Sequence, residues 1–139
     1  MKVVLGSDEK SQLADAVAAM LRDRGVDLVL IGPIAGEADQ WPTVGRRVGE
    51  EVSQGRAEFG VVFCWTGTGA SIAANKVTGV RAALCTDAQT AAGARRWNDA
   101  NVLVMSNRLT APAVAGEMLD AWFSTQPDES ERDNIASLG

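Results

Sequence analysis

The residues best suited to chemistry lie in one glycine-rich stretch in the middle of the chain, from Cys64 to Lys76. A short apolar run ends at Cys64, glycines follow at Gly67 and Gly69, and small residues continue from Ala70 to Ala74. This order predicts a strand, a tight loop and the first turn of a helix. Such a loop directs several backbone N–H groups and the positive end of a helix dipole at one point. A thiol beside these donors is a candidate nucleophile or base next to an oxyanion cradle.

The chain contains no histidine and no tyrosine, so proton transfer near pH 7 falls to thiol, carboxylate, lysine or backbone groups. Zinc sites with histidine ligands are excluded for the same reason. The two cysteines, Cys64 and Cys85, follow separate apolar runs and lack the spacing of a metal site. This pattern predicts reduced thiols in a cytoplasmic protein, with Cys85 serving packing rather than chemistry.

Composition and charge narrow the class of protein. The 139 residues suffice for one domain, which we expect to span residues 1–139. A net charge of −5 argues against a nucleic-acid partner, because phosphate backbones attract basic surfaces. No apolar run approaches the roughly 20 residues of a membrane span, so no membrane partner is expected. Residues 1–8 are typical of a strand rather than of a signal peptide.

Short apolar runs alternate with stretches of helical periodicity. The runs are Val3–Leu5, Leu28–Ile31, Gly60–Phe63, Ala82–Leu84 and Val102–Met105. Their length and their valine and isoleucine content are typical of strands buried on both faces. Helical faces recur within Leu13–Leu21, Val44–Val52, Ala91–Trp97 and Val114–Trp122, and Gly25 and Gly55 fall where helix C-caps are expected. The alternation predicts an α/β fold with a parallel sheet and right-handed crossovers.

Ligands in open α/β sheets bind beyond the carboxyl ends of the strands. That rule gathers the residues that follow the predicted strands, namely Asp8, Trp41, Cys64–Gly69, Thr86–Asp87 and Ser106–Arg108. A site is therefore expected on this edge of the sheet. The tail from Gln126 onward is polar with a short amphipathic piece, and the sequence leaves open whether it packs on a partner subunit or frays.

Three segments together resemble the ribose-5-phosphate isomerase B family, which includes the galactose-6-phosphate isomerase subunits. They are Cys64-x-Thr66-Gly67-x-Gly69-x-Ser71 continuing to Lys76, then Gly79–Cys85, then Asn98–Leu103. The resemblance extends over nearly the whole chain, from Asp8 to Trp122. It implies a three-layer Rossmann-like fold, with a five-stranded parallel sheet flanked by helices. It also implies a homodimer, or a dimer of dimers, with active sites at the subunit interface.

The family interconverts aldose and ketose sugar phosphates through an enediolate and needs no metal or other cofactor. By this resemblance Cys64 is the base that moves a proton between carbons 1 and 2, and Thr66 hydrogen-bonds nearby. A second branch of the family has a glutamate base where Ala70 stands in this chain. Alanine cannot act as a base, so the chain falls within the cysteine branch.

The resemblance also implies the groups that bind the substrate. Backbone amides from Gly67 through Gly69 and Ala70 to Ser71 would stabilise the enediolate oxygen. Asn98 would position the substrate, and Arg108 occupies a position that contributes to phosphate binding in the family.

The chain departs from the family at several of these site positions. Glu9 stands where the family has a histidine near the phosphate, and Trp97 stands where it has the ring-opening histidine. Trp65 replaces the glycine after the cysteine, and Trp41 replaces the tyrosine of an Asp-Tyr-Pro motif. Both arginines of the C-terminal motif are lost on the simplest alignment, although Arg132 could substitute with a shift.

These departures alter the expected substrate. Phosphate carries close to two negative charges near neutral pH and normally binds Arg, Lys or protonated His, whereas Glu9 and an acidic tail repel it. Trp41, Trp65 and Trp97 would build an aromatic pocket. We therefore expect an isomerase of an altered, unphosphorylated or bulkier sugar or polyol-like substrate. Either that substrate is already open-chain, or a carboxylic acid such as Asp8 or Glu9 opens the ring.

Two alternatives remain open from the sequence. The chain could be an ordinary pentose or hexose phosphate isomerase in which Arg108, Arg132 and a helix N-terminus bind the phosphate. It could also be a non-catalytic homologue that binds a ligand or pairs with another subunit. The many site substitutions favour the latter, and the intact Cys64 loop argues against it.

Overall fold

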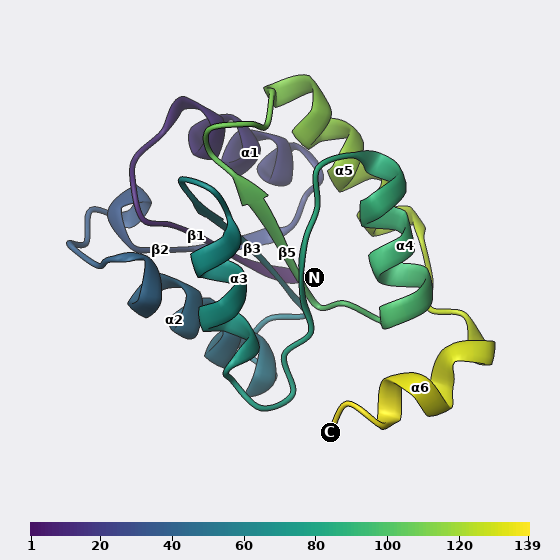
Figure 1. Cartoon of the computed structure of the whole chain (residues 1–139). Coiled ribbons are helices and arrows are strands. Elements are labelled where there is room, and N and C mark those ends of the chain that lie inside the picture. Colours follow the sequence, from purple (N-terminus) through teal and green to yellow (C-terminus); the bar gives the residue numbers. More distant parts are fainter.

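The five predicted strands form a single parallel sheet in the computed structural model, which describes residues 1–139 (Figure 1). They are β1 (Lys2–Ser7), β2 (Asp27–Ile31), β3 (Phe59–Cys64), β4 (Ala82–Leu84) and β5 (Val102–Ser106). Their spatial order is β2-β1-β3-β5-β4, and every neighbouring pair is parallel. Each strand contains one of the apolar runs, so the predicted fold class is confirmed.

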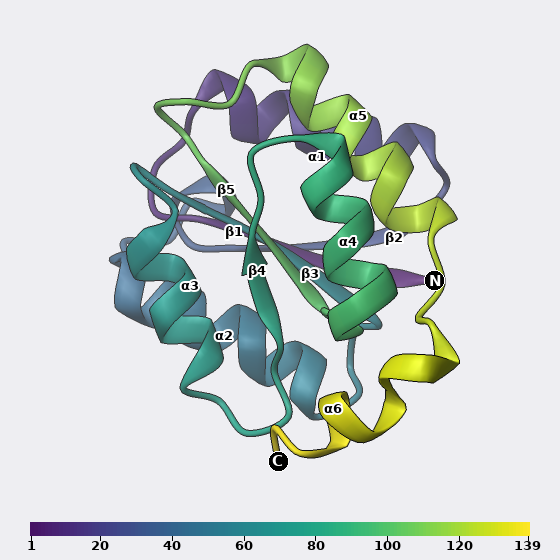
Figure 2. The same ribbon diagram turned by 45° about the vertical axis from the view of Figure 1, so that its right-hand side comes forward.

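Helices cover both faces of this sheet and give three layers (Figures 1 and 2). They are α1 (Gln12–Asp23), α2 (Trp41–Ser53), α3 (Thr68–Asn75), α4 (Ala88–Asn98), α5 (Pro112–Ser124) and α6 (Arg132–Ala136), with short 3-10 helices η1 (Pro33–Ala35) and η2 (Glu129–Glu131). α1, α4 and α5 pack on one face of the sheet, and α2 and α3 pack on the other. None of these helices is long and apolar enough to span a membrane.

Successive side chains of each strand face opposite sides of the sheet, so the buried core consists of two clusters. On β1, Val3 and Leu5 contribute to the cluster under α1, α4 and α5, whereas Val4 faces α2 and α3. In the first cluster the fully buried Trp122 of α5 meets Phe59 edge-on, with ring centroids 5.8 Å apart. Because both faces are buried, the strands are continuously apolar and not alternately polar.

The order of the strands places the switch point of the sheet between β1 and β3. Ser7 pairs in register with Phe63, so the two strands end side by side. Asp8 follows β1 directly, and Cys64 is the last residue of β3, so both lie at the carboxyl edge of the sheet. This is the place where open α/β sheets bind their ligands.

Two glycines allow α2 to lie close against α3, the helix that begins after the Cys64 loop. A Cβ atom at Gly45 would lie 2.8 Å from Ala73 Cβ and 3.0 Å from the Ala70 carbonyl oxygen. A Cβ atom at Gly49 would lie 3.1 Å from Val77 Cγ2. This close approach fixes how deeply the start of α3 sits against the sheet.

We predict that Gly45→Ala destabilises the protein by about 1–3 kcal/mol, because the added methyl group meets backbone and a neighbouring Cβ that must both shift. The matched control is Gly116→Ala in α5, where the nearest atom is Met20 Sδ at 3.7 Å. Alanine favours helix more than glycine, so this control should gain up to about 1 kcal/mol. Urea denaturation measures both variants, and equal free energies of unfolding would contradict the close α2–α3 contact.

Candidate active site

The Cys64 loop opens into a small hollow at the carboxyl ends of β1 and β3. The hollow has a volume of about 280 Å³. It is lined by Asp8, Trp41, Cys64, Trp65, Thr66, Thr68 and Gly69. Its size suits a small molecule. The range Cys64–Gly69 predicted at this edge includes Thr68, but the sequence predicted no role for Thr68 itself, although its place in the first turn after the glycine loop was a usable signal.

The sulfur of Cys64 is held by two backbone donors. Cys64 is only 4% exposed, and the N–H groups of Gly67 and Ala70 donate to its Sγ at 3.2 and 3.4 Å. The positive end of α3 adds to the same field, since that helix starts at Thr68. The two donors and the helix dipole together direct partial positive charge at the sulfur.

Gly67 makes this arrangement possible. Its φ of +83° lies in the left-handed region, which other residues adopt only under strain. A Cβ atom there would also lie 2.5 Å from Leu84 Cδ1 and 3.3 Å from the Met105 backbone. The turn can therefore fold back on the sulfur only with glycine at this position.

Two N–H groups at the start of α3 have no acceptor in the protein. The N–H of Ser71 donates to the Gly67 carbonyl at 3.0 Å, and those of Gly67 and Ala70 point at the sulfur. The N–H groups of Thr68 and Gly69 donate to no protein atom, and both residues line the hollow. These two amides are the donors that the first turn of α3 offers to a developing oxyanion.

The polar side chains of the hollow are a carboxyl and two hydroxyls. Burial raises the pKa of Asp8, and the adjacent charge of Glu9 raises it further, against a smaller opposing effect of the Asp8 backbone. Thr66 Oγ1 lies 2.8 Å from Thr68 Oγ1, so the two hydroxyls form a pair. Glu9 itself is exposed outside the lining. No group of three or more Cys, Asp or Glu side chains is placed to hold a metal ion.

Two of the three site tryptophans form walls of the hollow. Trp41 packs on Gly69 so closely that a Cβ atom there would lie 2.8 Å from its Cε3. Trp41 and Trp65 remain 42% and 61% exposed, so their rings face solvent as well as the hollow. No lysine or arginine lines the hollow. The site therefore combines aromatic walls with uncharged donors and one carboxyl group.

Besides Glu9 and the predicted amide donors Gly67, Ala70 and Ser71, four predicted site residues lie outside this hollow. Trp97 and Asn98 line a second hollow of about 510 Å³ between β4 and α4. Arg108 donates its backbone N–H to the Trp65 carbonyl at 3.0 Å, but its exposed side chain is not part of the lining. Arg132 begins α6 and pairs with Glu129, and both ribbon views place α6 away from the loop before α3 (Figures 1 and 2).

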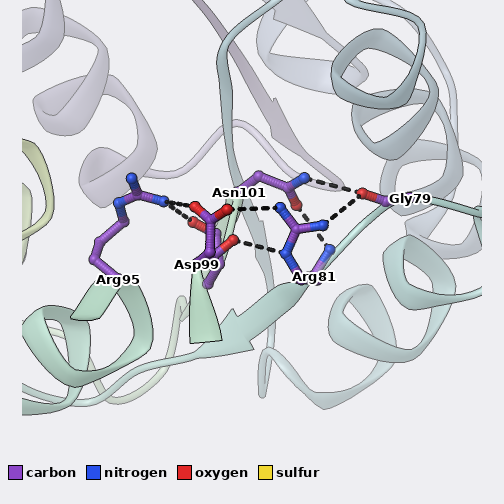
Figure 3. Close-up of polar contacts among 6 residues, drawn as sticks. Gly79, Arg81, Arg95, Asp99 and Asn101 are labelled. Carbon is purple, nitrogen blue, oxygen red and sulfur yellow. Dashed lines mark hydrogen bonds and ion pairs between the residues drawn. The ribbon is translucent and has the colours of Figure 1, made fainter. Parts of the chain in front are cut away.

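A network of polar contacts fixes the end of α4, where the second hollow begins. Asp99 follows the helix in the left-handed region, with φ +45°. Its carboxylate accepts from Arg95 at 3.0 Å and from Arg81 at 3.4 Å (Figure 3). The Asn101 side chain accepts from the Arg81 backbone N–H at 2.7 Å. These contacts tie the last turn of α4 to the start of the edge strand β4.

Comparison with known proteins agrees with this fold. Residues 3–137 match the family model described as Ribose/Galactose Isomerase. Ribose-5-phosphate isomerase B of Escherichia coli is 34% identical over 126 residues, covering 90% of this chain and 85% of that protein. D-erythrulose-4-phosphate isomerase of Pectobacterium atrosepticum is 30% identical over 128 residues, covering 91% of this chain and 84% of that protein. The structure of Clostridium thermocellum ribose-5-phosphate isomerase B superposes with a TM-score of 0.93 at 35% identity, covering 100% of this chain and 95% of that one. The chain therefore belongs to the ribose/galactose isomerase family and is an aldose–ketose isomerase.

Proposed function

We propose that Cys64 is the base of this isomerase and that the amides of Thr68 and Gly69 stabilise the enediolate. The thiolate removes the proton from the hydroxyl-bearing carbon next to the carbonyl group, and the electron pair moves to the carbonyl oxygen. The thiol then returns a proton to the former carbonyl carbon, while the hydroxyl proton passes to the neighbouring oxygen. The observation that carries this proposal is a sulfur held by two N–H groups, beside two further N–H groups that have no acceptor.

Asp8 is the better placed of the two carboxyl candidates for the acid. It lines the hollow, whereas Glu9 is exposed outside it. Burial and the charge of Glu9 raise the pKa of Asp8, which eases the uptake of a proton that Asp8 can then donate to a ring oxygen or carry between the two substrate oxygens. The Thr66 and Thr68 hydroxyls line the same hollow and can form hydrogen bonds with these substrate oxygens.

The walls of the hollow support a substrate that differs from a plain sugar phosphate. No cationic side chain lines it, and Trp41 and Trp65 offer aromatic faces on which the C–H groups of a polyol can stack. We propose an unphosphorylated or bulkier sugar or polyol-like hydroxycarbonyl compound as the substrate. A pentose or hexose phosphate is the second candidate, because the Arg108 side chain forms no ion pair within the chain and its backbone N–H donates to the Trp65 carbonyl of the loop.

A homodimer would complete the site. Within one chain Trp97 and Asn98 line a hollow of their own, separate from Cys64. A second copy would supply these residues, and Arg132, from its α4 and α6 to the first copy's Cys64 hollow. We propose this interface arrangement as the state in which the enzyme turns over.

We predict that Cys64→Ala lowers turnover by about 10²–10⁴-fold, the range typical of losing a general base. The assay couples aldose–ketose conversion to a panel of phosphorylated and free sugars, with deuterium wash-in from D₂O as a second readout. The matched control is Cys85→Ala, which removes the other buried thiol from the core and should leave proton exchange intact. Full activity of Cys64→Ala would show that Cys64 is not the base. Tight binding of a sugar to the wild-type protein without any deuterium exchange would indicate a non-catalytic homologue.

The double substitution Glu9→His with Trp65→Gly tests the substrate class. Since it removes a negative charge and an aromatic wall, we expect kcat/KM for ribose 5-phosphate to rise by about tenfold or more relative to the free sugar. Arg108→Ala serves as the control, because it should lower only the turnover of phosphorylated substrates. If the wild-type enzyme turns over ribose 5-phosphate efficiently and Arg108→Ala abolishes that turnover, the substrate is a sugar phosphate instead.

Asp8→Asn should raise the melting temperature at pH 7. A carboxyl whose folded pKa is raised favours folding when protonated, so its stabilising effect is present at low pH and is lost as the pH rises through the folded pKa. The gain from Asp8→Asn should therefore shrink as the pH falls towards the ordinary value of 3.8. Asp87→Ala is the control of opposite sign, because the Thr90 N–H lowers the pKa of Asp87. Thermal denaturation across pH measures both, and a pH-independent difference for Asp8→Asn would refute a raised pKa.

A further inference from the structure

The end of β5 and the residues that follow it donate hydrogen bonds to the backbone of the Cys64 loop. The N–H of Asn107 donates to the Cys64 carbonyl at 2.9 Å. The N–H of Arg108 and the Oγ of Ser106 both donate to the Trp65 carbonyl, at 3.0 and 2.9 Å. These two carbonyl groups precede the turn whose N–H groups donate to the sulfur. The position of that turn therefore depends on the segment after β5.

The side chain of Asn107 makes a second, distant connection. Its Oδ1 accepts from Ser11 Oγ at 2.8 Å, and Ser11 Oγ in turn accepts from the Ala14 N–H at 3.0 Å as the N-cap of α1. Ser11 ends the short segment that carries Asp8 out of β1. Asn107 is thus bonded through its backbone to the thiol residue and through its side chain to the segment of the carboxyl residue.

Stability does not explain this amide. Asn107 Nδ2 is buried and has no hydrogen-bond partner. An unsatisfied buried donor costs free energy comparable to what one hydrogen bond contributes, so the two effects of the side chain largely offset each other. A polar residue that adds little to stability, at the carboxyl edge of β5, calls for a role in the site.

We propose that Asn107 is a positioning residue that sets the separation between the Cys64 thiol and the Asp8 carboxyl. The inference rests on the proposed roles of those two groups. Its backbone N–H fixes the strand end of Cys64, and its Oδ1 fixes the start of α1. Catalysis depends steeply on such separations, since displacement of a reacting group by about 1 Å can cost about 10²-fold in rate.

Kinetics of matched variants test the link. Asn107→Ala and Ser11→Ala each remove one end of the side-chain hydrogen bond, and each should lower kcat by about tenfold with KM changed less than about twofold. The double variant should lose no more than either single one, because both break the same contact. Ser11→Thr keeps a hydroxyl and a cap and should retain wild-type kcat. Losses that multiply, or an Asn107→Ala kcat within twofold of wild type, would overturn the proposal.

Amide hydrogen exchange tests the same link without any substrate. In Asn107→Ala, we expect the N–H groups of Gly67, Ala70 and the substituted position 107 to exchange at least about fivefold faster, with Val61 and Leu103 in the core unchanged. Unchanged exchange at Gly67 and Ala70 would overturn the positioning role. If instead the wild-type protein exchanges no substrate proton, the proposed function fails, and the amide exchange rates still decide the role of Asn107.

Discussion

Two backbone N–H groups directed at one sulfur are the interaction on which the site depends. They require a chain reversal immediately after a buried strand, and Gly67 is the residue that permits it, because its left-handed φ strains any residue with a side chain and a Cβ atom would lie 3.3 Å from the Met105 backbone. They also require a helix that starts at a fixed depth. The glycines of α2 fix the position of α3, because they allow the two helices to pack closely. The packing on one face of the sheet therefore controls the geometry at its carboxyl edge.

The proposed chemistry and the proposed substrate contacts belong to different parts of the structure. The thiol, its donors and the free amides belong to one continuous loop whose geometry is fixed by backbone. The groups that would select a substrate are side chains that point into the hollow from separate elements, such as Trp41 from α2 and Asp8 after β1. Side chains can change without disturbing the loop. A family member can therefore keep its proton transfer while its pocket loses cations and gains tryptophans.

The sequence was sufficient for the fold, because the fold depends on local patterns, and the same patterns predicted where the candidate site lies. Continuous apolar runs mark doubly covered strands, and Gly67 and Gly69 after Cys64 mark the loop. What the sequence did not reveal depends on three-dimensional detail. Which amides remain free depends on where α3 starts and on how its first turn meets the sulfur. Asn107 and Ser11 are 96 positions apart, and no local pattern joins them. The separation of Trp97 from Cys64 likewise follows from the sheet order, which places β5 and β4 beyond β3.

Because Trp97 lies apart from Cys64, the second hollow is a surface that another copy of the chain can cover. The end of α4 is fastened by one carboxylate shared between two arginines, in a conformation that few residues other than glycine, asparagine and aspartate tolerate. A half-site that is exposed but rigid loses little conformational entropy when another surface covers it. Trp97 lies on such a surface, 54% exposed and packed against Gly93. The proposed dimer would therefore join two preorganised halves, the loop with the thiol from one copy and the fastened helix end from the other.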